Sequence, residues 1–478
     1  MELYVHIPFC LRKCRYCDFY SVPCGNASGI GCADPKTYGS LPKTGDYVNA
    51  LLKELDARKD ELKGKEITSV FFGGGTPTIL SCSELEMLIT GIRSRINTGV
   101  LNRREEDVGI EASDHPYGNE SGKNQNSENK KRNNSTEITV ECNPGTLDKE
   151  KLTLMRELGV NRLSIGLQSA DNRELAALGR IHTYEEFLTN YEEARKTGFD
   201  NINIDLMSGI PGQTVASCEK TLNTVAGLAP KHISVYSLIL EEGTPLFDDV
   251  EAGRVRLPDE DFDRDMYRLT GQILSAHGYE RYEISNYAKP GHRCRHNMGY
   301  WTGEEYLGLG PTAASYLGTG DALCRETLAA SCLGTGDVLC PETLEVSHLG
   351  TVDALCRESL VNSNPKCGSK DTLPAVMYRY KNPADLMAYM ADPAGVRVLE
   401  ETLDRKALMS EYMILRLRLT EGADRDEFKK RFGVPMDEVF GDIIKRYKGL
   451  GLMEDKGDCI ALTSKGFDVA NSVMCEFM

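Results

Sequence analysis

The sequence predicts an α/β protein built as a complete or partial (β/α) barrel, followed by a small α+β domain of the winged-helix type. Short apolar runs alternate with longer amphipathic segments over most of the first 300 or so residues. Strand and helix follow each other about six times, which is typical of parallel βα units and not of a sandwich or a bundle. The last part of the chain instead combines helices with one short hairpin.

The predicted strands are short apolar runs at 3–7, 67–72, 137–141, 162–167, 201–207 and 232–238. The predicted helices carry apolar residues at helical spacing and lie at 47–62, 82–96, 149–158, 184–197 and 214–228. Parallel folds of this kind place their sites at the carboxyl ends of the strands. The residues that follow each strand are therefore the first candidates for function.

Three segments interrupt the alternation. Residues 22–45 are rich in Gly, Pro and Ser and predict a long loop, whereas 102–135 has almost no apolar content and predicts a disordered insert. From 316 to 363 a sixteen-residue unit occurs three times, which we interpret as duplication in a tolerant loop because three short copies give little core. The regularly spaced cysteines of this repeat follow from the duplication, so we place no metal site there.

We therefore expect three parts: a barrel core at 1–315 with its two loop inserts, a poorly ordered repeat insert at 316–376, and a C-terminal domain at 377–478. In the last part, 405–418 predicts a helix, and the alternation of helices with a hairpin after it resembles a winged helix. Such domains often bind DNA. A formal net charge of −16 argues against a phosphate-binding surface and favours a structural or docking role, without a nucleic-acid partner.

The composition, 40% hydrophobic and 27% charged, is that of a soluble protein. No apolar stretch approaches the roughly 20 residues that span a bilayer, and "MELYVHIPFC" has the features of neither a signal peptide nor a transit peptide. We expect a cytoplasmic protein. Its sixteen cysteines are then reduced thiols, some of them metal ligands.

Three cysteines, Cys10, Cys14 and Cys17, follow the first predicted strand in "FCLRKCRYCDF". Thiolates select zinc and iron–sulfur clusters, but a closed zinc site takes four ligands, and no second cysteine pair follows closely. A cubane [4Fe-4S] cluster held by three thiolates leaves one iron open for a substrate or cofactor. The basic residues of this loop, Arg12, Lys13 and Arg15, would favour thiolates and an anionic cluster.

This loop resembles the signature of the radical S-adenosylmethionine (SAM) superfamily, C-x3-C-x2-C with an aromatic residue, here Tyr16, before the last cysteine. Further motifs occur in the order seen in the oxygen-independent coproporphyrinogen III oxidase group: "YVHIPFC", "FFGGGTP", "ECNPGTL", "RLSIGLQS", "DLMSGIPGQT", "YEISNYA", "HNMGYW" and "GLGPTAASYLG". The resemblance covers most of the chain outside the inserts. It implies a partial barrel of the radical SAM type, a [4Fe-4S] cluster whose open iron binds SAM, and an electron donor for the cluster.

The residues after the strands suit SAM binding. Glu141 and Asp205 close two predicted strands, where a carboxylate can accept from an amine or a ribose hydroxyl, and Arg180 can pair with a carboxylate. The glycines of "FFGGGTP" allow close approach of the backbone. By resemblance, the SAM contacts are Tyr4, Gly75, Thr76, Glu141, Gln168, Arg180 and Asp205.

The group that the chain resembles contains two kinds of protein: an oxidase that decarboxylates two propionates of coproporphyrinogen III, and heme chaperones that bind heme and pass it on. The oxidase has a further cysteine two positions after the third, where this chain has Phe19. The oxidase also has an extended N-terminal segment, whereas nine residues precede Cys10 here. Both features favour the chaperone.

Heme iron binds imidazole readily, and His296 lies in "HNMGYW", which resembles the heme-binding motif of the chaperone branch. Tyr300 and Trp301 could pack on a porphyrin face. His292 and Cys294 are alternative ligands. The group's pattern has a second histidine at the position of Ala314, so we expect no function that needs it.

We therefore predict a heme chaperone that carries a SAM-binding [4Fe-4S] cluster and hands heme to an acceptor protein that the sequence does not name. The alternatives are a coproporphyrinogen III oxidase and a radical SAM enzyme with another substrate. No catalytic residue is assigned, and the extent of radical chemistry stays open, because an intact SAM site permits cleavage without requiring it.

Overall fold

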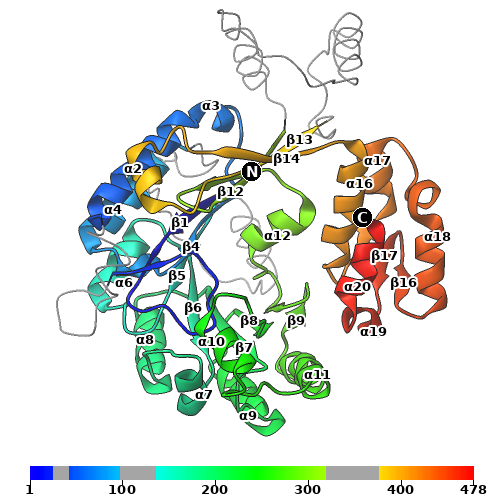
Figure 1. Ribbon diagram of the computed structural model, residues 1–478, viewed down its shortest axis with the longest axis horizontal. Helices are drawn as coiled ribbons and strands as arrows, with labels where there is room; N and C mark the ends of the chain where they lie inside the picture. Colours follow the sequence, from blue (N-terminus) through cyan, green and yellow to red (C-terminus); the bar gives the residue numbers. More distant parts are fainter. Residues whose placement is uncertain (25–41, 97–135, 319–375) are drawn as a thin grey trace, which may run out of the picture.

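The computed structural model describes residues 1–24, 42–96, 136–318 and 376–478. The insert predicted at 102–135, most of the loop predicted at 22–45 and the repeats beyond residue 318 lie outside the described residues. A twelve-stranded sheet curves through the larger part of the molecule, with helices along its outer face (Figure 1). Its strand order is β14-β13-β12-β11-β1-β4-β5-β6-β7-β8-β10-β9.

The middle of the sheet is parallel. It contains β11 (Tyr306–Leu309), β1 (Glu2–Ile7), β4 (Ser69–Gly74), β5 (Glu137–Cys142), β6 (Arg162–Gln168), β7 (Ile202–Ser208) and β8 (His232–Ser237). These strands are mostly buried on both faces, which explains why they read as apolar runs. All six predicted strands form, and their ends differ from the prediction by at most two residues.

Antiparallel strands finish both edges, so the barrel stays open. One edge has β10 (Asn286–Ala288) and β9 (Glu280–Arg281), and the other has β12 (Ala314–Gly318), β13 (Met377–Lys381) and β14 (Val398–Leu403). The predicted partial (β/α) barrel is confirmed. Strand β12 runs through the expected start of the insert at 316, and β13 and β14 extend the main sheet.

The outer helices are α2 (Thr44–Ala57), α3 (Lys59–Leu62), α4 (Cys82–Arg93), α6 (Lys149–Glu157), α7 (Asn172–Ala177), α8 (Tyr184–Lys196), α9 (Val215–Gly227), α10 (Pro245–Glu251) and α11 (Glu260–Ala276). The helix predicted at 47–62 divides into α2 and α3 at Arg58. Capping boxes start α4 at Ser81 and α8 at Thr183. In each, the hydroxyl accepts from the amide of the glutamate three residues later, and that glutamate side chain accepts from the amide of the capping residue. Helix α12 (Arg295–Thr302) lies on the concave side of the sheet (Figure 1).

The C-terminal domain has its own core. It contains α16 (Arg405–Leu417), β15 (Ala423–Asp424), α17 (Arg425–Phe432), α18 (Met436–Gly449), β16 (Met453–Lys456), β17 (Cys459–Leu462), α19 (Ser464–Phe467) and α20 (Ala470–Met474). Its three strands form a separate sheet of order β15-β17-β16, so the winged-helix-like prediction is confirmed. Aromatic residues dominate its interior, with Phe428 at the centre of several ring contacts.

The buried carboxylate of Glu54 links helix α2 to the segments on both sides of the repeat insert. Glu54 of α2 accepts hydrogen bonds from the Gly310 amide at 2.8 Å, from Asn382 Nδ2 at 2.7 Å and from the Tyr389 hydroxyl of α15 (Leu386–Ala391) at 2.7 Å. Burial raises the pKa of Glu54, against the lowering effect of these donors. The strands on either side of the insert are therefore fixed to a helix of the barrel.

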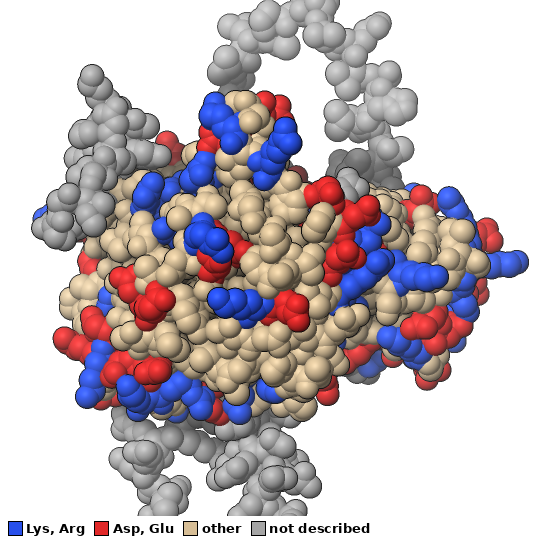
Figure 2. All heavy atoms as spheres, turned by 90° about the horizontal axis from the view of Figure 1, so that it is seen from below, with Lys and Arg blue, Asp and Glu red and all other residues tan. Residues whose placement is uncertain are grey.

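In the described part of the chain, no helix is both long and apolar enough to span a bilayer. The face in Figure 2 shows basic and acidic side chains interspersed over both the barrel and the C-terminal domain.

Candidate cluster and cofactor site

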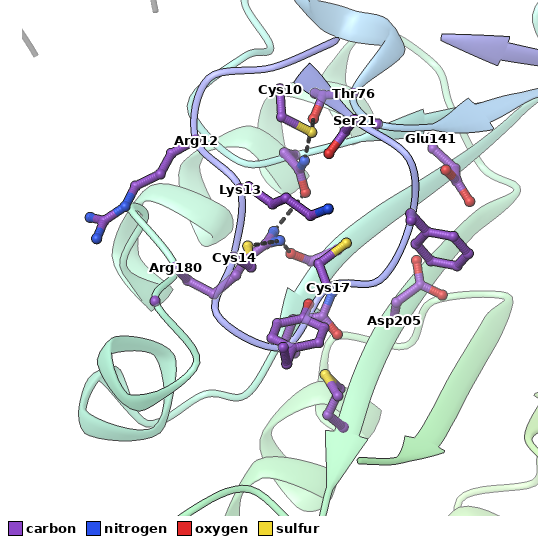
Figure 3. Close-up of a pocket in the computed structure, with 18 of the residues that line it drawn as sticks. Cys10, Arg12, Lys13, Cys14, Cys17, Ser21, Thr76, Glu141, Arg180 and Asp205 are labelled. Atoms are coloured by element: carbon purple, nitrogen blue, oxygen red, sulfur yellow. Dashed lines mark hydrogen bonds between the residues drawn. The ribbon is translucent and has the colours of Figure 1, made fainter. Parts of the chain in front are cut away.

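A cavity of about 540 Å³ opens at the carboxyl ends of the parallel strands. Cys10, Cys14 and Cys17 line it, and Figure 3 shows them around one side of the space. Six of the seven predicted SAM contacts also line this cavity: Gly75, Thr76, Glu141, Gln168, Arg180 and Asp205. Residues from the carboxyl ends of β4, β5, β6 and β7, from the cysteine loop and from the loop after α7 thus meet in one place.

The cysteine loop starts at β2 (Phe9–Cys10), which pairs with β3 (Val22–Pro23), and its middle is anchored by Arg15. The Arg15 amide donates to Leu178 O at 3.1 Å, and Arg15 O accepts from the Leu246 amide at 2.9 Å. Its guanidinium forms an ion pair with Asp249 of α10. Arg15 therefore fixes the loop, and its charge is directed toward Asp249 and not toward the thiols.

Arg180 places a cation in direct contact with one thiol. Its Nη1 donates to Cys14 Sγ at 3.5 Å, and its Nη2 donates to Asn143 Oδ1 at 2.6 Å. Asn143 in turn donates to Thr76 Oγ1 at 2.6 Å, which lies 3.5 Å from Cys10 Sγ. A polar chain thus links two of the three cysteines (Figure 3). Sequence reasoning missed Asn143, although its place directly after β5 was a signal.

The loop cations differ in direction. Lys13 extends across the space between the cysteines, whereas Arg12 points away from it (Figure 3). Burial raises the pKa of the Cys10 thiol and raises that of Cys17 to about 11. A metal deprotonates the thiols that it binds, so the raised pKa values of Cys10 and Cys17 are compatible with cluster binding.

The donor set fits a [4Fe-4S] cluster. In the described residues no three thiol, imidazole or carboxylate groups gather as the ligands of a single ion would. In a cubane, each thiolate binds a different iron, so the thiols need not meet at a point. The buried Arg180 Nε has no hydrogen-bond partner among the described residues and offers a donor to an anionic group.

The glycines of "FFGGGTP" bring the end of β4 against the cysteine strand. A Cβ on Gly75 would lie 2.6 Å from Phe9 O and 2.7 Å from Ile7 O, and Gly74 has φ +101°. The Gly75 amide donates to Ile7 O at 2.9 Å and the Thr76 amide donates to Phe9 O at 2.7 Å. The close approach required here is therefore to the protein's own backbone.

Two carboxylates form the polar floor of the cavity. Glu141 accepts from the Gly74 amide at 3.0 Å, and burial, followed by the charge of Asp205, raises the pKa of Glu141 to about 7. Asp205 accepts from Ser164 Oγ at 2.9 Å and Asn203 Nδ2 at 2.8 Å, and burial raises its pKa too. A ligand amine or hydroxyl would complete the hydrogen bonding of both groups.

Gln168 has a left-handed backbone, with φ 74°, at a bulge in the pairing of β6 with β7. A non-glycine residue held in this region stores strain, which is typical of ligand sites. The structure thus gives Gln168 a conformation that ordinary strand pairing does not require.

Tyr4 does not line the cavity. Its hydroxyl lies 3.1 Å from His6 Nδ1, and His6 Nε2 lies 2.9 Å from Tyr20 O. The Tyr4 ring lies beside the stacked rings of Phe71 and His296, with a centroid distance of 6.3 Å to each. In this structure, Tyr4 therefore contacts residues behind the cavity wall and not the cavity itself.

His296, the predicted heme ligand, is 2% exposed on α12. Its Nδ1 lies 2.6 Å from Ser69 Oγ, its Nε2 lies 3.1 Å from the Tyr300 hydroxyl, and its ring stacks on Phe71 at 4.9 Å. Both ring nitrogens are therefore engaged inside the protein. Axial ligation by His296 would require one of these bonds to break.

The residues around His296 are also enclosed. Cys294 is buried, with Sγ 3.5 Å from Glu137 Oε1, whereas His292 is half-buried. The guanidinium carbon of Arg418 lies 4.3 Å from the centre of the Trp301 ring, so the C-terminal domain covers that ring face. Ala314, at the position of the absent second histidine, starts β12.

A buried hydrogen-bond chain connects the cavity floor to α12. Asn203, which donates to Asp205, accepts from His232 Nδ1 at 2.6 Å. His232 Nε2 accepts from the Tyr282 hydroxyl at 2.9 Å, and that hydroxyl accepts from the Cys294 amide at 3.4 Å. Burial holds the pKa of His232 well below its usual value, so the imidazole is neutral. Sequence reasoning found neither His232 nor Tyr282.

Comparison with known proteins agrees with this geometry. A model of the radical SAM superfamily matches residues 4–225, and one of the HemN C-terminal domain matches residues 403–469. The heme chaperone HemW of Bacillus subtilis is 30% identical over 99% of this chain and 98% of its own, and that of Escherichia coli is 35% identical over 65% and 68%.

The fold is also that of the coproporphyrinogen III oxidase HemN from Escherichia coli, a radical SAM enzyme. The TM-score is 0.66 at 19% identity, over 100% of this chain and 89% of that one. At this identity the likeness concerns the fold alone. With a relative 30% identical along nearly the whole of both chains, this chain belongs to the radical SAM superfamily and, within it, to the HemW family.

Proposed function

We propose that this protein is a heme chaperone: it binds heme and transfers it to an acceptor protein, and it carries a SAM-binding [4Fe-4S] cluster. The observation that carries the proposal is similarity to the Bacillus subtilis heme chaperone HemW along 99% of the chain. The cavity supports it, because it holds three thiols and a polar floor side by side.

In this proposal Cys10, Cys14 and Cys17 hold the cluster. Gly75, Thr76, Glu141, Gln168, Arg180 and Asp205 contact SAM, with Arg180 facing its carboxylate and Glu141 its amine. Tyr4 lies behind the cavity wall, so its predicted contact with SAM requires its side chain to move. When bound, SAM and the reduced cluster supply radical chemistry, and Arg180 and Asn143 keep the thiol side of the cavity in position.

His296 stays the predicted heme ligand. Because His296 is buried, ligation has to accompany a rearrangement around α12 that frees one ring nitrogen from Ser69 or Tyr300. Heme is the cargo, and the acceptor and the electron donor are proteins still to be identified. We place the protein in the cytoplasm by analogy with its bacterial relatives.

The alternative with the best specific support is an oxidase acting on coproporphyrinogen III, because the fold is that of HemN. Phe19 argues against it. This side chain stands at the cavity, 68% exposed, at the position where the oxidase has a further cysteine.

A side-by-side assay separates these functions. Anaerobically reconstituted protein is titrated with heme by absorption spectroscopy, and the same preparation is incubated with coproporphyrinogen III, SAM and a reductant. The proposal expects saturable heme binding and no decarboxylated product. Robust product would establish the oxidase, and SAM cleavage without heme binding would favour an enzyme with another substrate.

A further inference from the structure

A buried carboxylate lies on the inner face of the sheet, beneath helix α12. Glu2 and Ser69 are the first residues of β1 and β4, and they pair in register, so their side chains lie on the same face. The Glu2 carboxylate accepts from the Ser69 hydroxyl and, at 2.7 Å, from Thr68 Oγ1. Both Glu2 and Ser69 are buried, and neither lines the cluster cavity, which opens at the other ends of these strands.

Helix α12 approaches this carboxylate closely because a glycine lies at the point of contact. A Cβ on Gly299 would lie 2.6 Å from Glu2 Cγ and 2.7 Å from Glu2 Oε1. A larger residue would therefore push the helix away from β1. His296 lies three residues before Gly299 on the same side of the helix, and its Nδ1 is 3.6 Å from Glu2 Oε2.

The hydrogen bonds around His296 determine which ring nitrogen carries the proton. Ser69 directs its hydroxyl hydrogen to the Glu2 carboxylate, so its oxygen accepts from His296 Nδ1 at 2.6 Å. Nδ1 therefore carries the proton. Nε2 has the lone pair and accepts from the Tyr300 hydroxyl at 3.1 Å. The nitrogen with the lone pair is the one that a heme iron can bind.

The two sides of the imidazole differ in how firmly they are held. On the Nδ1 side, the partners belong to two strands of the sheet and are buried. On the Nε2 side, the partner is Tyr300, which is half-buried and lies one turn further along α12 itself. Phe71 stacks on the His296 ring at 4.9 Å and fixes its plane. Turning Tyr300 frees Nε2 and leaves the contacts of α12 with the strands in place.

We propose that Glu2, acting through Ser69, is a positioning residue for the heme ligand: it holds His296 as the tautomer that binds heme through Nε2 and increases electron donation from that nitrogen to the iron. This inference rests on the proposed function and concerns its heme ligand. Histidines that bind metals commonly donate their second N–H to an oxygen acceptor, which fixes the ring and raises its basicity. A hydroxyl between ring and carboxylate transmits this effect, because linked hydrogen bonds polarise one another.

The proposal has a consequence that a purely structural role does not have. Stronger donation by the axial ligand favours ferric over ferrous heme, because the ferric iron has the higher charge. Loss of the Glu2 charge is therefore expected to weaken binding of ferric heme more than that of ferrous heme. Damage to the fold alone weakens both equally. The ratio of the two affinities, and hence the reduction potential of bound heme, separates the two roles.

The test compares Glu2→Gln with Glu54→Gln in the full-length, cluster-loaded protein. Glutamine keeps the size of the side chain and an oxygen acceptor but removes the charge. Glu54 is the matched control, because it is also a buried glutamate with several hydrogen bonds, and its partners Gly310, Asn382 and Tyr389 lie outside α12. Ferric and ferrous heme are titrated anaerobically by absorption spectroscopy, well below the lowest Tm of the set, and the reduction potential of each complex is measured.

We expect Glu2→Gln to bind ferric heme about tenfold more weakly and ferrous heme nearly as wild type does, which raises the reduction potential by about 59 mV. Glu54→Gln should keep the wild-type potential. Ser69→Ala should shift the potential in the same direction as Glu2→Gln, and the double variant should add little, because both changes break one chain of hydrogen bonds. Tyr300→Phe should bind heme about fivefold more tightly, because it removes the competing hydroxyl.

The outcomes separate this inference from the proposed function. A wild-type potential in both Glu2→Gln and Ser69→Ala would refute the role of Glu2 and leave the chaperone proposal standing. Weaker heme binding by Tyr300→Phe would contradict the assignment of Nε2 as the nitrogen that Tyr300 covers. Folded His296→Ala with the heme spectrum and affinity of wild type would remove the ligand and, with it, this inference. Wild type that binds no heme would overturn the proposed function itself.

Discussion

Replacing His296 by alanine is expected to destabilise the barrel, whether or not this histidine binds heme. The substitution removes the partners of the Tyr300 hydroxyl and of Ser69 Oγ, although Ser69 keeps its hydrogen bond to Glu2. A buried polar group without a partner costs about 1–3 kcal/mol, and the lost ring contact with Phe71 adds to it. We expect a loss of about 3 kcal/mol in the free energy of unfolding.

Unfolding entropy of about 2.1 cal/mol/K per residue turns this loss into a fall of about 5 °C in Tm for a folding unit of roughly 300 residues. Differential scanning calorimetry of cluster-loaded protein measures the fall. His277→Ala is the control, because that exposed histidine has one contact of 3.4 Å with Asn223, and we expect a shift below about 1 °C. A shift this small for His296→Ala would refute the reasoning.

The result decides how heme titrations are interpreted. If His296 has the structural role described here, the heme affinity of His296→Ala has to be measured well below its lowered Tm. A loss of affinity in the folded variant then reports a lost ligand. A loss that follows the fraction unfolded reports only the damaged core.

Three further predictions concern Glu141 on the cavity floor, Gly75 after β4, and the hydrogen bonds of the buried Glu54. Because burial holds the pKa of Glu141 near 7, above the unfolded value of about 4.3, its contribution to stability is present at low pH and is lost as pH rises through this window. The free energy of unfolding of Glu141→Gln, measured in urea, should therefore rise by about 2 kcal/mol relative to that of wild type between pH 5 and pH 8. The same pH dependence in both proteins would contradict this. Gly75→Ala should reduce the iron content after reconstitution, because its Cβ meets two carbonyl oxygens of the cysteine strand, whereas Gly227→Ala, with open space around it, should not. Glu54→Ala leaves three buried donors unpaired and should cost about 3–5 kcal/mol, with faster hydrogen exchange at 310–318 and 376–389; unchanged exchange there would argue against this link.

The parallel core could be predicted because its signals are local. Strands buried on both faces read as apolar runs, and the capping residues of α4 and α8 mark their starts. The antiparallel edge from β12 to β14 could not, because β12 and β13 pair across the long repeat insert. That pairing depends on contacts between distant parts of the chain, such as those of Glu54.

In the site, too, local sequence signals predicted some features, and contacts between distant residues determine the others. The motif spacing identified the three cysteines and the residues at strand ends, and the structure brings these together around one cavity. It did not identify the anchoring role of Arg15, whose partner Asp249 is far away in the sequence. Nor could a motif show that Tyr4 lies behind the cavity wall or that both nitrogens of His296 are engaged. These properties come from side-chain packing, which spacing does not encode.

The central claim, that this protein is a heme chaperone, is tested most directly by counting heme on the intact protein. Anaerobically purified, cluster-loaded chain is mixed with excess heme and separated by gel filtration, and heme and protein are measured in the same fraction. The account predicts retention of one heme per chain, with an absorption spectrum distinct from that of free heme. Protein that emerges without heme while still binding SAM would contradict it.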